Sequence, residues 1–203
     1  MSLLVSGMSH HTTPLEIRER LAFGPEAQPE ALRGLRERLD GAGVVILSTC
    51  NRVEVYVHHP SNAEHVRTEL RRFLCESRSL REDLLTSHLY EYEGSEAVAH
   101  LFRVSTSLDS LVVGEGQILG QVHDAYQLAH AHNATDKILN ALFQRAFSLA
   151  KEVRSQTAIC AGKVSIGSVA VDLAVSIFMK LTDKTVLVIG SGKMGELALK
   201  SLV

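Results

Sequence analysis

Two apolar runs joined by a short polar segment constrain the fold of this sequence most. Residues 44–49 (VVILST) and 53–59 (VEVYVHH) are rich in β-branched residues, and Cys50, Asn51 and Arg52 lie between them. The alternation of valine in the second run is typical of a strand with one buried face. We therefore expect two strands that meet at this polar segment, with Cys50 at the joint.

The rest of the first 157 residues mixes strand patterns with helical patterns. This mixture predicts an α+β domain over residues 1–157, in which helices pack on a mixed or antiparallel sheet. With 45% hydrophobic but only 5% aromatic residues, the core must be mainly aliphatic. Residue spacing predicts further strands at 3–9 and 88–94, helices at 14–23, 29–39 and 61–77, and a mostly helical stretch at 95–157 that is broken near Gly114 and Gly116.

A different pattern follows residue 157. An apolar helix is predicted at 164–181, and a β-type run at 185–189 leads into a glycine-rich turn and another helical pattern. Strand, G-x-G-x-x-G turn and helix in this order are typical of a Rossmann-like α/β domain, whose turn brings a dinucleotide pyrophosphate to the helix amides. A strand-to-helix turn that binds nothing is the alternative. The expected cofactor-binding residues are Gly190, Ser191, Gly192, Lys193, Met194 and Gly195.

Residues 158–203 hold only the first β-α unit of such a domain. A parallel sheet needs several strands, and the acidic residue that binds the cofactor ribose would follow about 20 residues later. We therefore expect this sequence to be part of a longer protein. The turn by itself is compatible with either NAD or NADP.

Cys50 is the main candidate for a nucleophile. A strand joint gives a thiol access to substrate, and Arg52 supplies positive potential and can pair with a carboxylate. Thr49 and Asn51 offer short polar groups that can orient a substrate. The alternative is a small buried hydrophobe at a strand end, because free cysteine is often buried.

A thiol and a dinucleotide turn in one chain suggest a definite chemistry. A thiolate can attack an activated acyl group and hold it as a thioester. A thioester accepts hydride more readily than a carboxylate does, and a nicotinamide would supply that hydride.

Polar residues recur in the helical stretch that begins near residue 95. His100 can polarise a carbonyl or move a proton near neutral pH, although a partly exposed histidine without a role is the alternative. Gln117 and Gln121 are four residues apart and would point to one side of a helix. We interpret Asp109 as an ordinary solvated or capping residue outside the site. The candidate site residues of this stretch are His100, Ser110, Glu115, Gln117 and Gln121.

Charge and composition argue against several classes of protein. The net charge of −2 is not that of a broadly basic nucleic-acid surface. No apolar run approaches a membrane span and the N-terminus lacks a secretory pattern, so we expect a cytoplasmic protein without membrane contact. Cys75 and Cys160 are interpreted as packing residues, and the paired histidines lack any recognisable zinc spacing, so neither a disulfide framework nor a metal site is expected.

Four segments match a known family, in the family's order and over nearly the whole chain. The sequence resembles the glutamyl-tRNA reductases, which catalyse the first committed step of the five-carbon route to tetrapyrroles. The second and third segments are highly specific, whereas many dehydrogenases share the fourth. His123 and Gly116 depart from the lysine and proline common in the family. The segments are 7–23 (GMSHHTTPLEIRERLAF), 47–56 (LSTCNRVEVY), 100–122 (HLFRVSTSLDSLVVGEGQILGQV) and 186–195 (VLVIGSGKMG).

The resemblance implies roles for individual residues. Cys50 would take glutamate from glutamyl-tRNA as a thioester, and NADPH would deliver hydride to give glutamate-1-semialdehyde. His100 matches the family's activity-critical histidine. Arg52 would pair with the free side-chain carboxylate of glutamate and so reject glutaminyl-tRNA, whose amide leaves the guanidinium unmatched. The substrate pocket would comprise Thr49, Asn51, Arg52, Ser110, Glu115, Gly116, Gln117 and Gln121, and the NADPH turn residues 190–195.

The resemblance also implies partners. Glutamate-1-semialdehyde aminomutase would receive the product, and full-length members form a homodimer through a helical domain that these 203 residues do not include. We therefore do not expect the same dimer here.

Three hypotheses follow for the function of the chain. The first is the tRNA-dependent reductase or a part of it, which in isolation would form the thioester and lose it to water as an esterase. The second is a non-catalytic domain that binds tRNA or a pathway partner. The third is a cysteine hydrolase unrelated to tRNA. The thiol favours the first hypothesis over the second, and the glycine turn favours it over the third.

Overall fold

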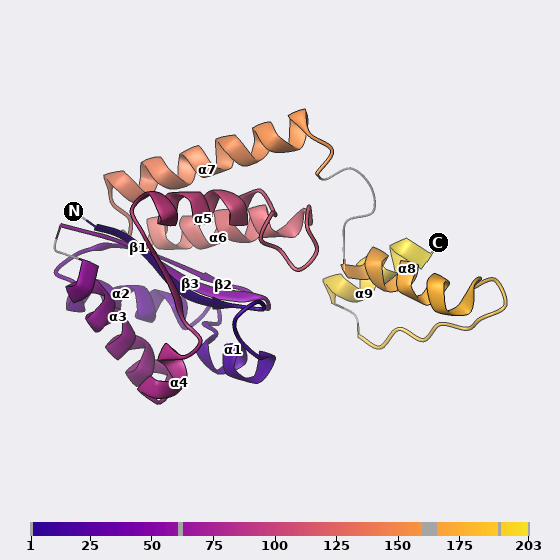
Figure 1. Ribbon diagram of the computed structural model, residues 1–203, viewed down its shortest axis with the longest axis horizontal. Helices are drawn as coiled ribbons and strands as arrows, with labels where there is room; N and C mark the ends of the chain where they lie inside the picture. The colour runs from indigo at the N-terminus through magenta and orange to yellow at the C-terminus, as the bar shows by residue number, and fades with distance from the viewer. Residues whose placement is uncertain (1, 61–62, 160–165, 191, 203) are drawn as a thin grey trace.

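The computed structural model describes residues 2–60, 63–159, 166–190 and 192–202, and a four-stranded antiparallel sheet lies between helices in its N-terminal part (Figure 1). The strands lie in the order β2-β3-β1-β4, and every neighbouring pair is antiparallel. The α+β fold and the four strands predicted within residues 1–157 are therefore confirmed. The strands are β1 (Ser2–Ser9), β2 (Gly43–Ser48), β3 (Arg52–His59) and β4 (Tyr90–Glu93).

The register of the two central strands determines what lies next to the polar segment. Arg52, the first residue of β3, pairs with Ser9 at the end of β1, and Glu54 pairs with Gly7. A Cβ atom on Gly7 would lie 2.6 Å from the carbonyl oxygen of Val53 and 2.8 Å from Cγ of Glu54. Only glycine therefore allows β1 and β3 to approach this closely where Glu54 is held.

Helices cover both faces of the sheet. Figure 1 shows α5, α6 and α7 on one face and α1 to α4 on the other. As a result, Glu54 and Tyr56 of β3 are as fully buried as Val53, Val55 and Val57. The prediction of a single buried face was therefore wrong, because alternation along a strand does not reveal a second helical layer. The helices are α1 (Leu15–Leu21), α2 (Gln28–Arg38), α3 (Ala63–Arg78), α4 (Glu82–Thr86), α5 (Ser95–Ser105), α6 (Gln117–Ala131) and α7 (Lys137–Gln156).

The helices follow the sequence patterns closely. The core between them and the sheet is mostly aliphatic, as expected from the composition. The predicted break between α5 and α6 is present as a loop at residues 106–116, where Gly114 adopts φ +87°. Asp136 begins α7 by accepting a 2.8 Å hydrogen bond from the backbone N–H of Leu139. The predicted helix at 61–77 is observed from Ala63, and residues 61 and 62 lie outside the described residues.

Only some of the elements predicted after residue 157 are observed. The predicted helices are present as α8 (Ile166–Phe178) and α9 (Lys193–Leu202), and they pack against each other so closely that a Cβ on Gly167 would lie 2.9 Å from the backbone nitrogen of Ala198. The strand predicted at 185–189 is not formed, and Leu187 and Ile189 are 81% and 90% exposed. A strand needs a partner for its backbone hydrogen bonds, and no other described segment pairs with this one.

Candidate active site

Cys50 is exposed at the tip of a tight turn between β2 and β3. The Thr49 hydroxyl accepts hydrogen bonds from the backbone N–H groups of Asn51, at 3.2 Å, and of Arg52, at 3.1 Å. The backbone N–H of Thr49 donates a 2.8 Å bond to the Arg52 carbonyl. A threonine side chain that satisfies the turn's own amides fixes its shape, so Thr49 presents the thiol outward rather than leaving it in the core.

A pocket of about 90 Å³ adjoins this turn. Ile118, which sequence reasoning missed, is the one apolar aliphatic residue that lines it. Of the predicted substrate residues, only Gly116 is absent from the lining; it immediately precedes α6, and its carbonyl accepts a 3.2 Å bond from Arg154. The tertiary structure thus joins two segments that are about 60 residues apart in the sequence. The pocket is lined by Thr49, Cys50, Asn51, Arg52, Ser110, Glu115, Gln117, Ile118 and Gln121.

The far wall of the pocket comes from the loop before α6 and from the first turns of that helix. Gln117 and Gln121 are one turn apart on α6 and both line the pocket, as their spacing predicts. Ser107 holds the loop, because its hydroxyl donates a 2.6 Å bond to the Glu115 carbonyl. The hydroxyl of Ser110 is buried and has no hydrogen-bond partner among the described residues. A buried orphan hydroxyl in a pocket wall is suited to a polar ligand.

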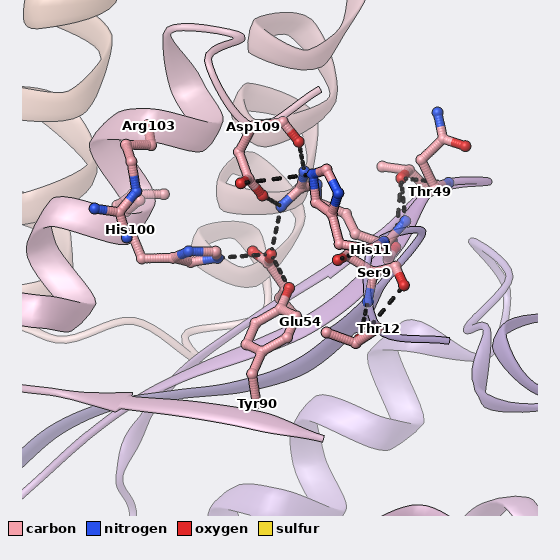
Figure 2. A network of polar contacts seen from close by, with 12 residues as sticks. Ser9, His11, Thr12, Thr49, Glu54, Tyr90, His100, Arg103 and Asp109 are labelled. Atoms are coloured by element: carbon pink, nitrogen blue, oxygen red, sulfur yellow. Dashed lines mark hydrogen bonds and ion pairs between the residues drawn. The ribbon is translucent and has the colours of Figure 1, made fainter. Parts of the chain in front are cut away.

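Arg52 extends from the turn into a largely buried ion-pair cluster. Its side chain is 1% exposed, and Nη1 lies 2.7 Å from Oε1 of Glu54 and 3.0 Å from Oδ2 of Asp109 (Figure 2). Nη2 donates to the backbone carbonyl of Asp109. The expectation that Asp109 is a solvated or capping residue outside the site was therefore wrong, because the fold brings the loop after α5 onto Arg52.

Glu54 is the centre of this cluster. Besides Arg52, three groups donate to its carboxylate: the hydroxyls of Tyr56 and Tyr90, both at 2.5 Å, and Nε2 of His100 at 2.8 Å. Burial by itself raises the pKa of Glu54, but the His100 hydrogen bond and the Arg52 charge outweigh it and lower the pKa from 4.5 to about 2. Sequence reasoning missed Glu54, although a lone acidic residue inside the run VEVYV was an available signal.

His100 does not line the pocket. It is 3% exposed on α5, and its ring lies 5.3 Å and 4.9 Å, centroid to centroid, from the rings of Tyr90 and Tyr92. Figure 2 shows its imidazole directed at Glu54. Glu54 in turn pairs with Arg52. The partial exposure assumed in the alternative was therefore wrong, because His100 is buried and hydrogen-bonded. In this geometry, His100 reaches the pocket only through Glu54 and Arg52.

The loop after β1 closes the other side of the turn. The backbone N–H of His10 donates a 2.9 Å bond to the Asn51 carbonyl. Partial burial and the neighbouring His11 and Arg52 lower the pKa of His10. Nε2 of His11 lies 3.9 Å from Oδ1 of Asp109. The pair thus lies in a loop that contacts the ends of the cluster.

The glycine-rich turn has part of the geometry that a dinucleotide requires. Gly190 adopts φ +119°, and a Cβ on Gly195 would lie 2.8 Å from the Gly190 carbonyl oxygen. These features match the tight turn and the close helix packing that the first and third glycines of such a motif provide. Lys193 and Met194 begin α9, while Ser191 lies outside the described residues. The glycines at both ends of the turn, Gly190 and Gly195, thus fit a pyrophosphate-binding turn.

The described residues contain neither a cluster of metal-ligating side chains nor a helix suited to span a membrane. No group of three or more histidine, cysteine or acidic side chains in that part of the chain is arranged to hold a metal ion. None of its helices combines the length and apolar character that crossing a membrane requires.

The fold and the pocket together define an α+β domain that presents a cysteine thiol beside a buried arginine–carboxylate cluster. The family model described as "Glutamyl-tRNAGlu reductase, N-terminal domain" matches residues 6–157. The chain belongs to the glutamyl-tRNA reductase family.

Individual relatives agree with this assignment. A glutamyl-tRNA reductase of Trichlorobacter lovleyi is 48% identical over 199 residues, which cover 98% of this chain and 45% of the relative. One of Geobacter metallireducens is 45% identical over the full chain and 46% of its own length. The solved glutamyl-tRNA reductase from Methanopyrus kandleri has a TM-score of 0.70 at 41% identity, over 98% of this chain and 46% of that one. The chain thus spans about half the length of these relatives.

Proposed function

We propose that the chain carries the acyl-transfer half of a glutamyl-tRNA reductase, within tetrapyrrole biosynthesis. The observation that carries this proposal is the pocket that joins Cys50 to the polar residues of the α6 region. The thiolate attacks the ester carbonyl carbon of glutamyl-tRNA. A carbon–sulfur bond forms, the bond to the ribose oxygen breaks, and the ribose oxygen takes a proton, so glutamate remains on Cys50 as a thioester.

In this proposal the pocket recognises the glutamate side chain. The α-carboxyl of glutamyl-tRNA is esterified, so the side-chain carboxylate is the free anion, and Arg52 is the cation that lines the pocket. A neutral amide in its place would lack the charge-assisted contact with Arg52, which discriminates against glutaminyl-tRNA. Ser110, Gln117 and Gln121 supply further polar groups to hold the substrate in place.

The second half of the reaction requires NADPH. Residues 190–195 are proposed to hold its pyrophosphate, and the bound cofactor would supply the hydride that reduces the acyl group to glutamate-1-semialdehyde. Glutamate-1-semialdehyde aminomutase is the proposed recipient of that product. Where no hydride is delivered, water can reach the exposed Cys50, and the acyl group would leave as glutamate. Hydrolysis of glutamyl-tRNA is therefore the second candidate function for the isolated chain.

Incubation with glutamate-labelled glutamyl-tRNA, followed by mass spectrometry, tests the proposal. We expect a glutamyl adduct on Cys50 that is lost in Cys50→Ser. Cys75→Ser is the matched control and should retain the adduct, because Cys75 lies on α3 outside the pocket. A folded wild-type chain that acquires no adduct on Cys50 overturns the proposal.

A further inference from the structure

Arg52 is shared by two carboxylates that differ in how firmly they are held. Glu54 is fully buried and accepts from His100, Tyr56 and Tyr90 as well as from Arg52. Asp109 is 26% exposed, and among the described residues its carboxylate forms ion pairs with Nη1 of Arg52, at 3.0 Å, and with Nε2 of His11, at 3.9 Å.

We infer that Asp109 occupies the position on Arg52 that the free carboxylate of the acyl substrate takes, and that the substrate anion replaces the Asp109 side chain. This inference rests on the proposed function for the identity of the substrate. It assigns Asp109 a part in substrate selection, which neither the sequence patterns nor the pocket lining indicated.

The charges around Arg52 are the first argument. One guanidinium already faces two carboxylates, so an entering anion would place three negative groups around a single positive one. In a buried setting such an excess is strongly unfavourable, and one carboxylate has to leave. Glu54 cannot leave, because it would give up four donors without access to water. Asp109 can rotate toward solvent, where water replaces the lost contact.

The backbone supplies the second argument. Nη2 of Arg52 donates to the carbonyl oxygen of Asp109, not to its side chain. This bond and the Glu54 pair remain when the Asp109 side chain rotates away. Arg52 would therefore stay in place for the incoming carboxylate, and the exchange would need no rearrangement of the sheet.

The next residue supplies the third argument. Ser110 lines the pocket with a buried hydroxyl that has no partner in the described part of the chain. The loop before α6 thus carries the exchangeable carboxylate and the unsatisfied hydroxyl on consecutive residues, and Ser110 lines the same pocket as Arg52. A ligand carboxylate that displaces Asp109 from Arg52 would lie close to this hydroxyl, and a hydrogen bond from it would favour the exchange.

Alkylation of Cys50 tests the inference without tRNA. Iodoacetate carries a carboxylate and iodoacetamide is its neutral counterpart; each forms a carbon–sulfur bond on Cys50 and releases iodide. Asp109→Asn and Asp109→Ser each free one side of Arg52. In both variants, the ratio of the iodoacetate rate to the iodoacetamide rate at Cys50 should therefore rise about fivefold. This is the factor expected for the loss of a partly exposed ion pair. Peptide mass spectrometry resolves Cys50 from Cys75, whose ratio should not change.

A control variant and a protection experiment make the result decisive. Glu76→Gln removes a carboxylate from a surface pair with Arg38 and should leave the Cys50 ratio unchanged. Glutarate should protect Cys50 from iodoacetamide at about fivefold lower concentration in the Asp109 variants than in the wild type. A ratio that is unchanged or lower in folded Asp109 variants overturns the inference. Because no arm uses tRNA, this result is independent of whether the glutamyl adduct forms.

Discussion

Arg52 and Glu54, two residues apart on β3, form an ion pair of 2.7 Å in which both side chains are excluded from water. Adjacent positions on one face of a strand bring them together, and the helices over that face bury them. This pair links the candidate pocket on one side to His100 on the other. Four of the predictions below follow from its geometry.

Replacement of Glu54 by glutamine should destabilise the protein strongly. It leaves the buried Arg52 charge with Asp109 as its remaining carboxylate, and breaking a buried pair in this way costs about 4 kcal/mol of unfolding free energy. Urea denaturation would measure the loss. Glu93→Gln, which removes a half-exposed carboxylate paired with Arg67, should cost less than about 1 kcal/mol. Equal losses in the two variants would contradict the central role of Glu54.

The free energy of unfolding should decrease as the pH is lowered through the range in which Glu54 titrates. Its pKa is lowered from 4.5 to about 2, so the unfolded chain binds this proton more readily than the folded chain does. The stabilisation is complete above pH 4.5 and is lost as the pH falls toward 2. Urea denaturation between about pH 5 and pH 2.5 should therefore show a wild-type loss about 2 kcal/mol larger than that of Glu54→Gln. Parallel pH profiles would refute this assignment.

Gly7→Ala should destabilise the sheet where Glu54 is held. The new Cβ would lie 2.6 Å from the Val53 carbonyl oxygen, and backbone atoms cannot yield as a flexible side chain can. We expect a loss of about 2 kcal/mol or more in thermal or urea denaturation. Gly24→Ala is the matched control, because nothing lies within 4 Å of its Cβ position. If Gly7→Ala leaves the free energy of unfolding unchanged, β1 and β3 can separate at this point without loss of stability.

His100 should affect the reaction by holding Glu54 in place, rather than by contacting the substrate. His100→Phe removes one donor from Glu54, and we expect formation of the glutamyl adduct to slow roughly tenfold. Iodoacetamide should still alkylate Cys50 at the wild-type rate, because His100 lies outside the pocket. His100→Gln, whose amide can donate to Glu54, should restore part of the adduct rate. A fall in the alkylation rate of His100→Phe would indicate direct action on the thiol.

NADPH should yield little semialdehyde with this chain. The glycine turn is present, but residues 185–189, which should form the strand before it, are unpaired and their apolar side chains largely exposed. A dinucleotide binds at the edge of a formed parallel sheet. Product analysis after incubation with glutamyl-tRNA, with and without NADPH, would measure this. Robust NADPH-dependent semialdehyde would show that the turn and α9 suffice.

Much of the fold could be predicted because local patterns and tertiary structure agree. Strands β1 to β4 and the long helices follow apolar spacing, and the break before α6 follows its glycines. The prediction of a strand at 185–189 was wrong for a physical reason. Its residues have strand propensity, but propensity without a hydrogen-bonding neighbour does not make a strand.

The candidate site could be predicted only where its residues carried visible chemistry. Cys50, Arg52 and the glutamines of α6 stood out by type and spacing, and the pocket brings them together. Glu54 and Asp109 did not stand out, because an isolated carboxylate in a sequence is usually solvated. Nothing in the local pattern showed that both would reach the same guanidinium.

The sequence by itself determined the family, the strands and helices of the α+β domain, and the polar segment that carries Cys50. The tertiary structure alone decided which of these residues meet. Helices on both faces of the sheet bury Glu54, and the closing of the α5–α6 loop onto β3 brings Asp109 to Arg52. Burial and long-range contact depend on how the layers pack, and residue spacing along a single chain does not encode that packing locally.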